Sequence, residues 1–170
     1  MKMLLVLLLA LMTGCTSAIK GGGEHDVTIF AVEGLGYGDY VTNGLVAPLQ
    51  STYEFNFIRI AWGGECPASY PTGKLIAVGH SLGGPRVLEC VLASGREWIL
   101  VVTLDARVTG QPYKAPPNAK TTINFYQKSL IFPGYPVEGS IQHQVFVGHT
   151  ELPSLPEVRN VVVDAIRGVP

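Results

Sequence analysis

Six short runs of mostly apolar residues recur along the chain after Asp26. Most of these runs are nearly continuous rather than alternating with polar residues, which is typical of strands buried on both faces of a parallel sheet. The pattern therefore predicts six strands, at residues 27–32, 55–61, 75–78, 98–104, 121–126 and 144–147.

Three other segments carry apolar residues at helical spacing. Residues 40–50 follow Asp39, which can cap a helix, but Pro48 predicts that this helix ends early. Residues 85–95 begin with a proline, which suits a first helical turn, and end with a glycine, which often terminates a helix. Residues 156–168 show the same two signals around an apolar stripe.

The order of these elements predicts an α/β domain with a mostly parallel sheet of about six strands and few flanking helices. The chain has 170 residues, 47% of them hydrophobic, which suits one domain with a buried core and argues against two. Residues 62–72, between the second and third strands, are short and contain glycine and proline, so we expect a bare loop where a crossover helix is usual. The chain also has no room for a cap domain between the fourth and fifth strands.

Composition argues against several classes of function. The formal net charge of −1 gives no electrostatic reason to expect nucleic acid as a partner. Three cysteines and four histidines supply too few well-spaced ligands for a finger-type zinc site. The glycine-rich segments match neither a P-loop nor a dinucleotide-binding pattern. We therefore expect neither a metal nor a cofactor.

The N-terminus carries a targeting signal. Lys2 is followed by nine apolar residues at positions 4–12, a length typical of a signal peptide and too short for an ordinary membrane span. The sequence Leu-Met-Thr-Gly-Cys at residues 11–15 resembles a bacterial lipoprotein signal, which implies cleavage before Cys15 and lipidation of its thiol. The alternative is an ordinary secretory signal in which Cys15 stands by chance.

The resemblance divides the chain into three parts and implies a location. Residues 1–14 are the expected signal peptide, residues 15–26 the lipid anchor and a flexible tether, and residues 27–170 the folded domain. The protein is then exported and anchored by lipid to a membrane of the cell envelope. In an oxidising compartment Cys66 and Cys90 can pair, whereas the alternative is that both stay reduced.

The segment Gly79-His80-Ser81-Leu82-Gly83 matches the pattern G-x-S-x-G. In this pattern the serine sits on a sharp, strained turn between a strand and a helix, where larger side chains two residues away would collide. A predicted strand precedes the motif and a predicted helix follows it, with a second glycine at Gly84. The segment resembles the nucleophile elbow of lipases and esterases in the α/β-hydrolase superfamily, and the resemblance covers most of residues 27–169. It implies that Ser81 is a catalytic nucleophile.

A serine nucleophile needs a histidine base, which we expect at the C-terminal edge of the sheet. His149 follows the last predicted strand at that edge and is our candidate. His25 lies before the first strand, His80 is expected to point away from the serine, and His143 begins the last strand at the wrong edge.

The base needs an acid to orient it, and Asp105 directly follows the predicted strand at 98–104. Its place between the serine and the histidine is the chain order of this superfamily. The same region resembles a subset of small lipase-like hydrolases that carry their acid after this strand. Glu138 is the alternative acid, and a solvated turn residue or helix cap is the alternative role for Asp105.

An oxyanion hole requires two backbone N–H groups. One is expected from Leu82, directly after the nucleophile. By the resemblance, the other comes from Leu35, in the glycine-rich loop at residues 33–38. Glu33 departs from the family, in which a histidine or a small residue often stands at this position.

Together these parts predict a serine hydrolase that cleaves carboxylic esters, such as lipid or other acyl esters, through an acyl-enzyme. Two alternatives remain: a thioesterase or acyltransferase with the same triad, and a non-catalytic envelope lipoprotein that keeps the fold. Five aromatic side chains are candidates to line an open apolar cleft, with ordinary packing as the alternative; they are Tyr37, Trp62, Tyr70, Phe132 and Tyr135.

Overall fold

The computed structural model of the chain describes residues 25–35, 38–107, 113–130 and 133–168. Within these ranges the main feature is a six-stranded sheet in the order β2-β1-β3-β4-β6-β8, in which every neighbouring pair is parallel. The α/β arrangement predicted from the sequence is confirmed. The strands are β1 (Val27–Glu33), β2 (Asn56–Ala61), β3 (Lys74–His80), β4 (Leu100–Leu104), β6 (Thr122–Tyr126) and β8 (Ile141–Gln144).

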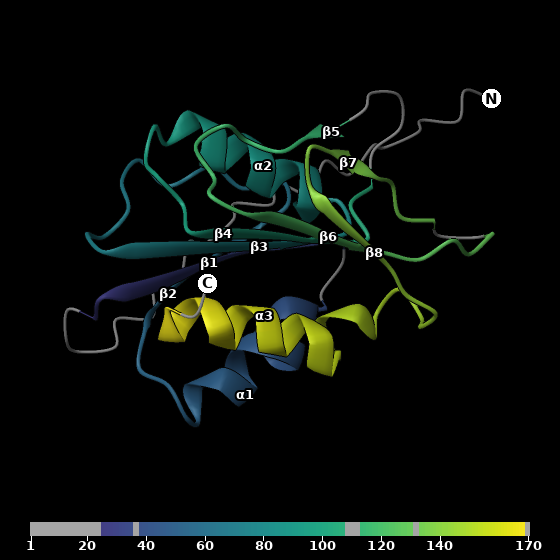
Figure 1. Cartoon of the computed structure of the whole chain (residues 1–170), viewed down its shortest axis with the longest axis horizontal. Coiled ribbons are helices and arrows are strands. Elements are labelled where there is room, and N and C mark those ends of the chain that lie inside the picture. Colours follow the sequence, from purple (N-terminus) through teal and green to yellow (C-terminus); the bar gives the residue numbers. More distant parts are fainter. Residues whose placement is uncertain (1–24, 36–37, 108–112, 131–132, 169–170) are drawn as a thin grey trace, which may run out of the picture.

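Helices cover both faces of the sheet (Figure 1). Helix α2 (Gly83–Ala93) lies on one face, and helices α1 (Ala47–Gln50) and α3 (Pro156–Arg167) lie on the other. A π-helical turn (Thr42–Val46) leads into α1, and a 3₁₀ turn (Leu152–Ser154) precedes α3.

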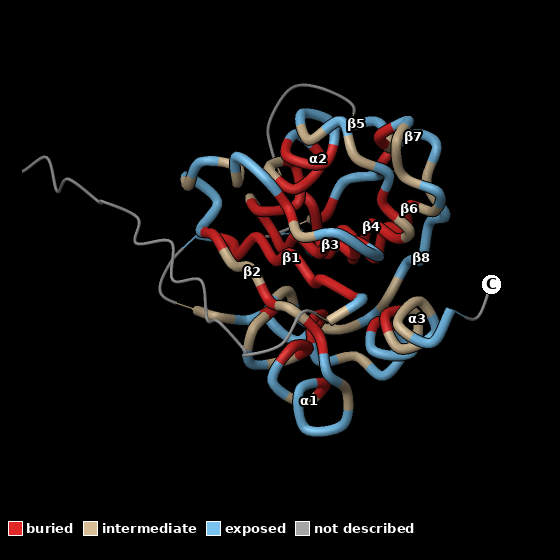
Figure 2. The backbone as a smooth tube through the Cα atoms, turned by 90° about the vertical axis from the view of Figure 1, so that its left-hand side faces the viewer, coloured by how far each residue is buried: buried red, intermediate tan, exposed pale blue. Residues whose placement is uncertain are grey.

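Alternation along the strands divides the buried side chains into two clusters. Ile29 and Ala31 of β1 point toward α1 and α3, whereas Phe30 and Val32 pack with the apolar side of α2. The sheet is therefore buried on both faces, as the nearly continuous apolar runs predicted, and Figure 2 shows it as the buried centre of the molecule.

The last strand lies earlier in the chain than predicted. Strand β8 is Ile141–Gln144 rather than residues 144–147, and all four of its residues are exposed. It forms an edge of the sheet, where Gln142 accepts a hydrogen bond from the Asn124 side chain at 2.8 Å. The apolar residues Val145 and Val147 instead follow the strand and pack against the core from a loop.

The first helical segment differs from the expectation in two ways. It continues through Pro48 to Gln50, because the proline lies in the first turn of α1, where a missing N–H is tolerated. Asp39 does not cap the helix with its side chain and instead forms an ion pair with Arg59. The capping group is Glu33, whose carboxylate accepts the backbone N–H groups of Val41 and Thr42 at 3.0 and 2.8 Å.

A second small sheet was not predicted. It pairs β5 (Tyr113–Lys114) with β7 (Val137–Glu138) in parallel, on the same side of the main sheet as α2 (Figure 1). Each strand has only two residues, which is too short to leave a periodic signal in the sequence.

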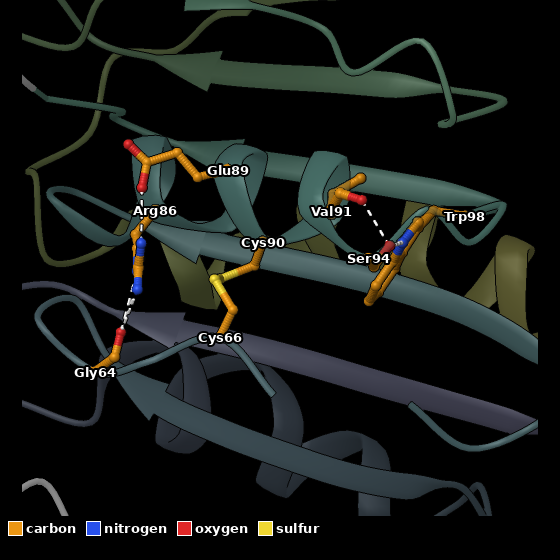
Figure 3. The surroundings of a disulfide bond; sticks show 8 residues. All are labelled: Gly64, Cys66, Arg86, Glu89, Cys90, Val91, Ser94 and Trp98. Atoms are coloured by element: carbon orange, nitrogen blue, oxygen red, sulfur yellow. Dashed lines mark hydrogen bonds and ion pairs between the residues drawn. A yellow bond between two sulfur atoms is a disulfide. The ribbon is translucent and has the colours of Figure 1, made fainter. Parts of the chain in front are cut away.

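The connection from β2 to β3 is a loop, as predicted, and it is fastened to α2. A disulfide joins Cys66 of the loop to Cys90 of α2, with their Cα atoms 5.3 Å apart (Figure 3). Arg86 of α2 donates two hydrogen bonds to the backbone oxygen of Gly64, at 3.1 and 2.8 Å. Of the two alternatives for these cysteines, the structure therefore has the paired one.

The same loop contributes Tyr70 to the core, so its predicted place in a substrate cleft is wrong. Tyr70 is buried between Phe30 and Trp98, with ring centroids 5.4 and 4.9 Å away in edge-to-face geometry. Burial raises the pKa of its hydroxyl to about 12. This aromatic cluster and the disulfide fill the place of the absent crossover helix.

The predicted signal peptide and the candidate lipidation site Cys15 lie outside the described residues. Among the residues that are described, no helix combines the length and the apolar character needed to cross a membrane.

Replacing both Cys66 and Cys90 with alanine should lower the free energy of unfolding by about 3 kcal/mol, because the disulfide restricts the unfolded chain. Urea unfolding of the two proteins measures this difference. A reductant should destabilise the wild type to a similar extent and leave the double variant unchanged. Equal unfolding midpoints for the oxidised wild type and the variant would contradict the prediction.

Candidate active site

The turn that carries Ser81 is packed too tightly for side chains at its glycines. A Cβ atom on Gly79 would collide with the backbone oxygen of Gly83, and one on Gly83 would collide with that of Val32. On Gly84, a Cβ atom would lie 2.7 Å from the Cβ atom of Ala106. The steric reason given for the glycines of this motif therefore holds in the structure.

Ser81 and Asp105 leave neighbouring strands at the same level of the sheet. The register pairs His80 with Leu104, so the next residue on each strand is the candidate nucleophile and the candidate acid. Both have left-handed backbone conformations, with φ of +56° at Ser81 and +48° at Asp105. Such strain in non-glycine residues costs roughly 1–3 kcal/mol each and is concentrated at functional sites.

The Asp105 carboxylate is completely buried and receives three hydrogen bonds. His149 Nδ1–H donates to Oδ2 at 2.8 Å. Gln127 donates its backbone N–H to Oδ1 at 2.8 Å and its side-chain amide to Oδ2 at 2.9 Å. These bonds replace the water that a buried carboxylate loses, and they fix its orientation toward the imidazole.

Gln127 is a site residue that the sequence interpretation missed. It directly follows β6, and its side-chain amide binds the carboxylate that follows the neighbouring strand β4. Its position directly after a predicted strand was the signal that could have indicated a site residue, because functional groups gather at the C-terminal ends of parallel strands.

His149 is brought to this edge by the loop that follows β8, and its side chain is 18% exposed. In the described part of the chain, the Ser81 hydroxyl makes no hydrogen bond with His149. Bonds between a nucleophile and its base are often long before substrate binds. The structure thus joins the candidate acid and base directly and brings the serine to the neighbouring strand end.

The sequence interpretation expected His80 to point away from the serine, and this expectation is wrong. Its Nε2 lies 2.9 Å from the backbone oxygen of His149, and the two imidazole centroids are 4.6 Å apart. Strand alternation does not continue past His80, because the backbone of Ser81 has left the extended conformation.

The other candidate residues lie in different surroundings. His143 is within β8, where its ring stacks on Phe125 with centroids 4.9 Å apart. His25 lies 3.9 Å from Glu54. Glu138, the alternative acid, is in β7 and lies 3.5 Å from the ammonium group of Lys114.

The loop after β1 lies directly against the serine. A Cβ atom on Gly34 would lie 2.9 Å from the Cβ atom of Ser81 and 3.1 Å from the backbone oxygen of His80. Leu35 follows Gly34, and Leu82 occupies the N-cap position of α2. The two expected oxyanion donors are therefore the residues adjacent to this close contact.

Glu33 anchors the start of that loop. It is only 2% exposed, and besides the two backbone N–H groups it accepts a hydrogen bond from the Thr42 hydroxyl at 2.7 Å. Arg59 Nε lies 3.8 Å from the same carboxylate. Glu33 thus joins the loop to the first helical turn, where a negative charge is favourable.

Exposed apolar side chains follow the strands that flank the site. Trp62 follows β2, Leu35 follows β1, and Leu130 and Phe146 lie beyond β6 and β8. A cavity of about 410 Å³ opens between the loops after β6 and β8, lined by residues 127–129, 144–148 and 151. Tyr135 is also exposed, whereas Tyr37 and Phe132 lie outside the described residues.

In the described ranges, no group of three or more histidine, cysteine, aspartate or glutamate side chains is arranged to hold a metal ion. No protein-family model, curated protein or solved structure matches the chain. The functional interpretation therefore depends on the chemistry of the site itself.

Replacing Gly34 with alanine should lower the free energy of unfolding by about 1–3 kcal/mol, because the new methyl group overlaps Ser81. Gly63→Ala is the matched control, since a Cβ atom there would have no neighbour within 4 Å. Thermal and urea unfolding measure both effects. Equal stability of the two variants would show that the loop does not press against the serine as described.

Proposed function

We propose that the protein is a serine hydrolase that cleaves carboxylic esters through a covalent acyl-enzyme, built on an α/β-hydrolase fold. The observation that carries the proposal is the buried Asp105–His149 hydrogen bond of 2.8 Å beside a serine held in a strained turn. The parallel six-stranded sheet, with these residues at the C-terminal ends of its strands, also supports it.

In the proposed reaction the Ser81 hydroxyl oxygen attacks the carbonyl carbon of the ester. His149 Nε2 accepts the hydroxyl proton and then transfers it to the leaving alcohol oxygen as the C–O bond breaks. Asp105 orients the imidazole through Nδ1 and stabilises its positive charge. A water molecule, deprotonated by His149, then attacks the acyl carbon. The bond between that carbon and Ser81 Oγ breaks, His149 returns the proton to the serine oxygen, and the carboxylic acid is released.

The negative charge on the carbonyl oxygen is stabilised by the backbone N–H groups of Leu82 and Leu35 in this proposal. The contact between Gly34 and Ser81 supports the role of Leu35, since it brings this loop to the serine. The N-terminus of α2 adds a favourable dipole at the same place.

The proposed substrates are esters with an apolar acyl group, including lipids. The exposed side chains of Leu35, Leu130 and Phe146, at the same edge as the site, support this substrate class. The described chemistry requires neither a metal nor an organic cofactor.

Export and lipid anchoring at Cys15 are part of the proposal. The Cys66–Cys90 disulfide supports export, because disulfides persist in oxidising compartments outside the cytosol. In this arrangement the chain from Cys15 to the start of β1 connects the domain to the membrane of the cell envelope.

The proposed serine chemistry predicts labelling of the protein by a fluorophosphonate probe, which reacts with activated serines. Ser81→Ala and His149→Ala should each slow labelling by about a thousandfold or more. His143→Gln is the matched control and should label at the wild-type rate, since the His143 ring stacks on Phe125 and has no role in the proposed reaction. Folded wild-type protein that takes up no probe would refute the enzyme proposal and favour a non-catalytic lipoprotein.

Lipidation is tested in a bacterial host that expresses the full chain and is grown in a medium containing an alkyne-tagged fatty acid. The tag should appear on the membrane-bound protein and be absent from Cys15→Ala, which lacks the acceptor thiol. Cys66→Ala should keep the tag. A wild-type protein that is exported without the tag would favour an ordinary secretory signal.

A further inference from the structure

We propose that His80 is a positioning residue that holds the His149 loop against the serine turn. This inference rests on the proposed function, because its catalytic consequence requires His149 to act as the base. This role differs from that of Asp105. Asp105 binds the imidazole ring of His149, whereas His80 binds the backbone oxygen of His149.

The contact joins two separate parts of the site. His80 is the last residue of β3 and precedes Ser81, whereas His149 lies in the loop after the edge strand β8. The Nε2–H group of His80 donates to the backbone oxygen of His149 at 2.9 Å. This bond crosses 69 positions of sequence and connects the centre of the sheet to the loop beyond its edge.

The ring of His80 is also enclosed between two side chains. The imidazole of His149 lies on one side at a centroid distance of 4.6 Å, and Tyr40 makes an edge contact at 5.5 Å. Tyr40 belongs to the segment that follows the proposed oxyanion loop. His80 therefore contacts the proposed base and the segment that follows the proposed oxyanion loop, and it directly precedes the serine in the chain.

The hydrogen-bonding state of His80 follows from its surroundings. A carbonyl oxygen accepts only, so Nε2 must carry the proton, and burial lowers the pKa of the ring to about 4. The ring is then neutral near pH 7, and Nδ1 is an unprotonated acceptor. A neutral neighbour does not repel the positive charge that forms on His149 during the reaction.

Nδ1 of His80 is buried and has no hydrogen-bond partner among the described residues. An unsatisfied buried acceptor is unfavourable, so an apolar side chain would suit this position better if only packing mattered. The geometry thus favours a histidine retained for its Nε2 donor. The bond adds to the packing of Val145 and Val147 in a loop whose residues Phe146 and Gly148 are exposed and which follows the exposed edge strand β8.

Two substitutions separate the donor from the packing. His80→Leu introduces an apolar side chain of similar size and removes the Nε2–H donor. His80→Gln instead places an amide N–H donor at a similar distance from the backbone. With p-nitrophenyl butyrate as the substrate, we expect His80→Leu to lower kcat about tenfold with little change in KM. His80→Gln should recover most of the lost kcat, and the unfolding midpoint of His80→Leu should stay close to that of the wild type.

A measurement independent of activity tests the contact itself. Nitrogen-15 NMR of the histidine rings in the wild type should show His80 as the neutral tautomer protonated at Nε2. The His80→Leu variant should show a weakened signal for the proton shared by His149 Nδ1 and Asp105. A merely structural role of His80 would lower stability without this loss and without rescue by glutamine.

Several results would overturn the inference. These are a kcat of His80→Leu within twofold of the wild type, a His80→Gln variant as slow as His80→Leu, or a His80 ring protonated at Nδ1. Failure of the proposed function is recognised separately, as a wild type that neither hydrolyses the ester nor takes up the fluorophosphonate. In that case the tautomer of the His80 ring, as observed by nitrogen-15 NMR, still tests whether His80 holds the His149 loop.

Discussion

The site depends on one buried carboxylate. Asp105 has no exposure to solvent, and a carboxylate in such a place is tolerated only when hydrogen bonds replace its water. Gln127 at the end of β6 and His149 beyond β8 supply those bonds to Asp105, which follows β4. The strands β4, β6 and β8 are consecutive in the sheet, so this one carboxylate links the ends of three neighbouring strands. The parallel register then places Ser81 at the end of the next strand. A change that tilts the carboxylate therefore moves the imidazole as well, which is why the acid and the base act as one unit in this account.

A small sheet with few helices needs other means to hold its loops. The connection from β2 to β3 is held by the Cys66–Cys90 disulfide and by Arg86, which bonds the backbone of Gly64. The loop after β1 is held by Glu33, and the loop after β8 by the two bonds to His149. The loops after β2 and β8 are thus held by contacts between residues far apart in the sequence, whereas Glu33 bonds to residues only eight and nine positions later. Long-range contacts of this kind are lost together when the domain unfolds, which favours a cooperative structure.

The sequence was sufficient for features that local patterns determine. The nearly continuous apolar runs predicted the buried parallel strands, and the glycines around Ser81 predicted the tight turn, because both follow from short-range sterics and burial. The edge strand β8 was misplaced because its polar residues 141–144 give no apolar signal, whereas the apolar residues after it pack from a loop. The role of Glu33 was missed because its partners are the backbone N–H groups of Val41 and Thr42, which leave no side-chain signal. The roles of His80 and Gln127 were missed because each depends on a partner 69 or 22 positions away in the sequence. Such partners are visible only once the fold brings the strand ends together.

The proposed mechanism requires that Ser81 becomes covalently acylated during turnover. The most direct test is to mix the full chain with p-nitrophenyl acetate, quench with acid within milliseconds to seconds, and determine the intact mass and the modified peptide. The proposed mechanism predicts one acetyl group per chain, located on Ser81, and its disappearance as the ester is exhausted. Steady release of nitrophenol without an adduct, or an acetyl group on another residue, would contradict it.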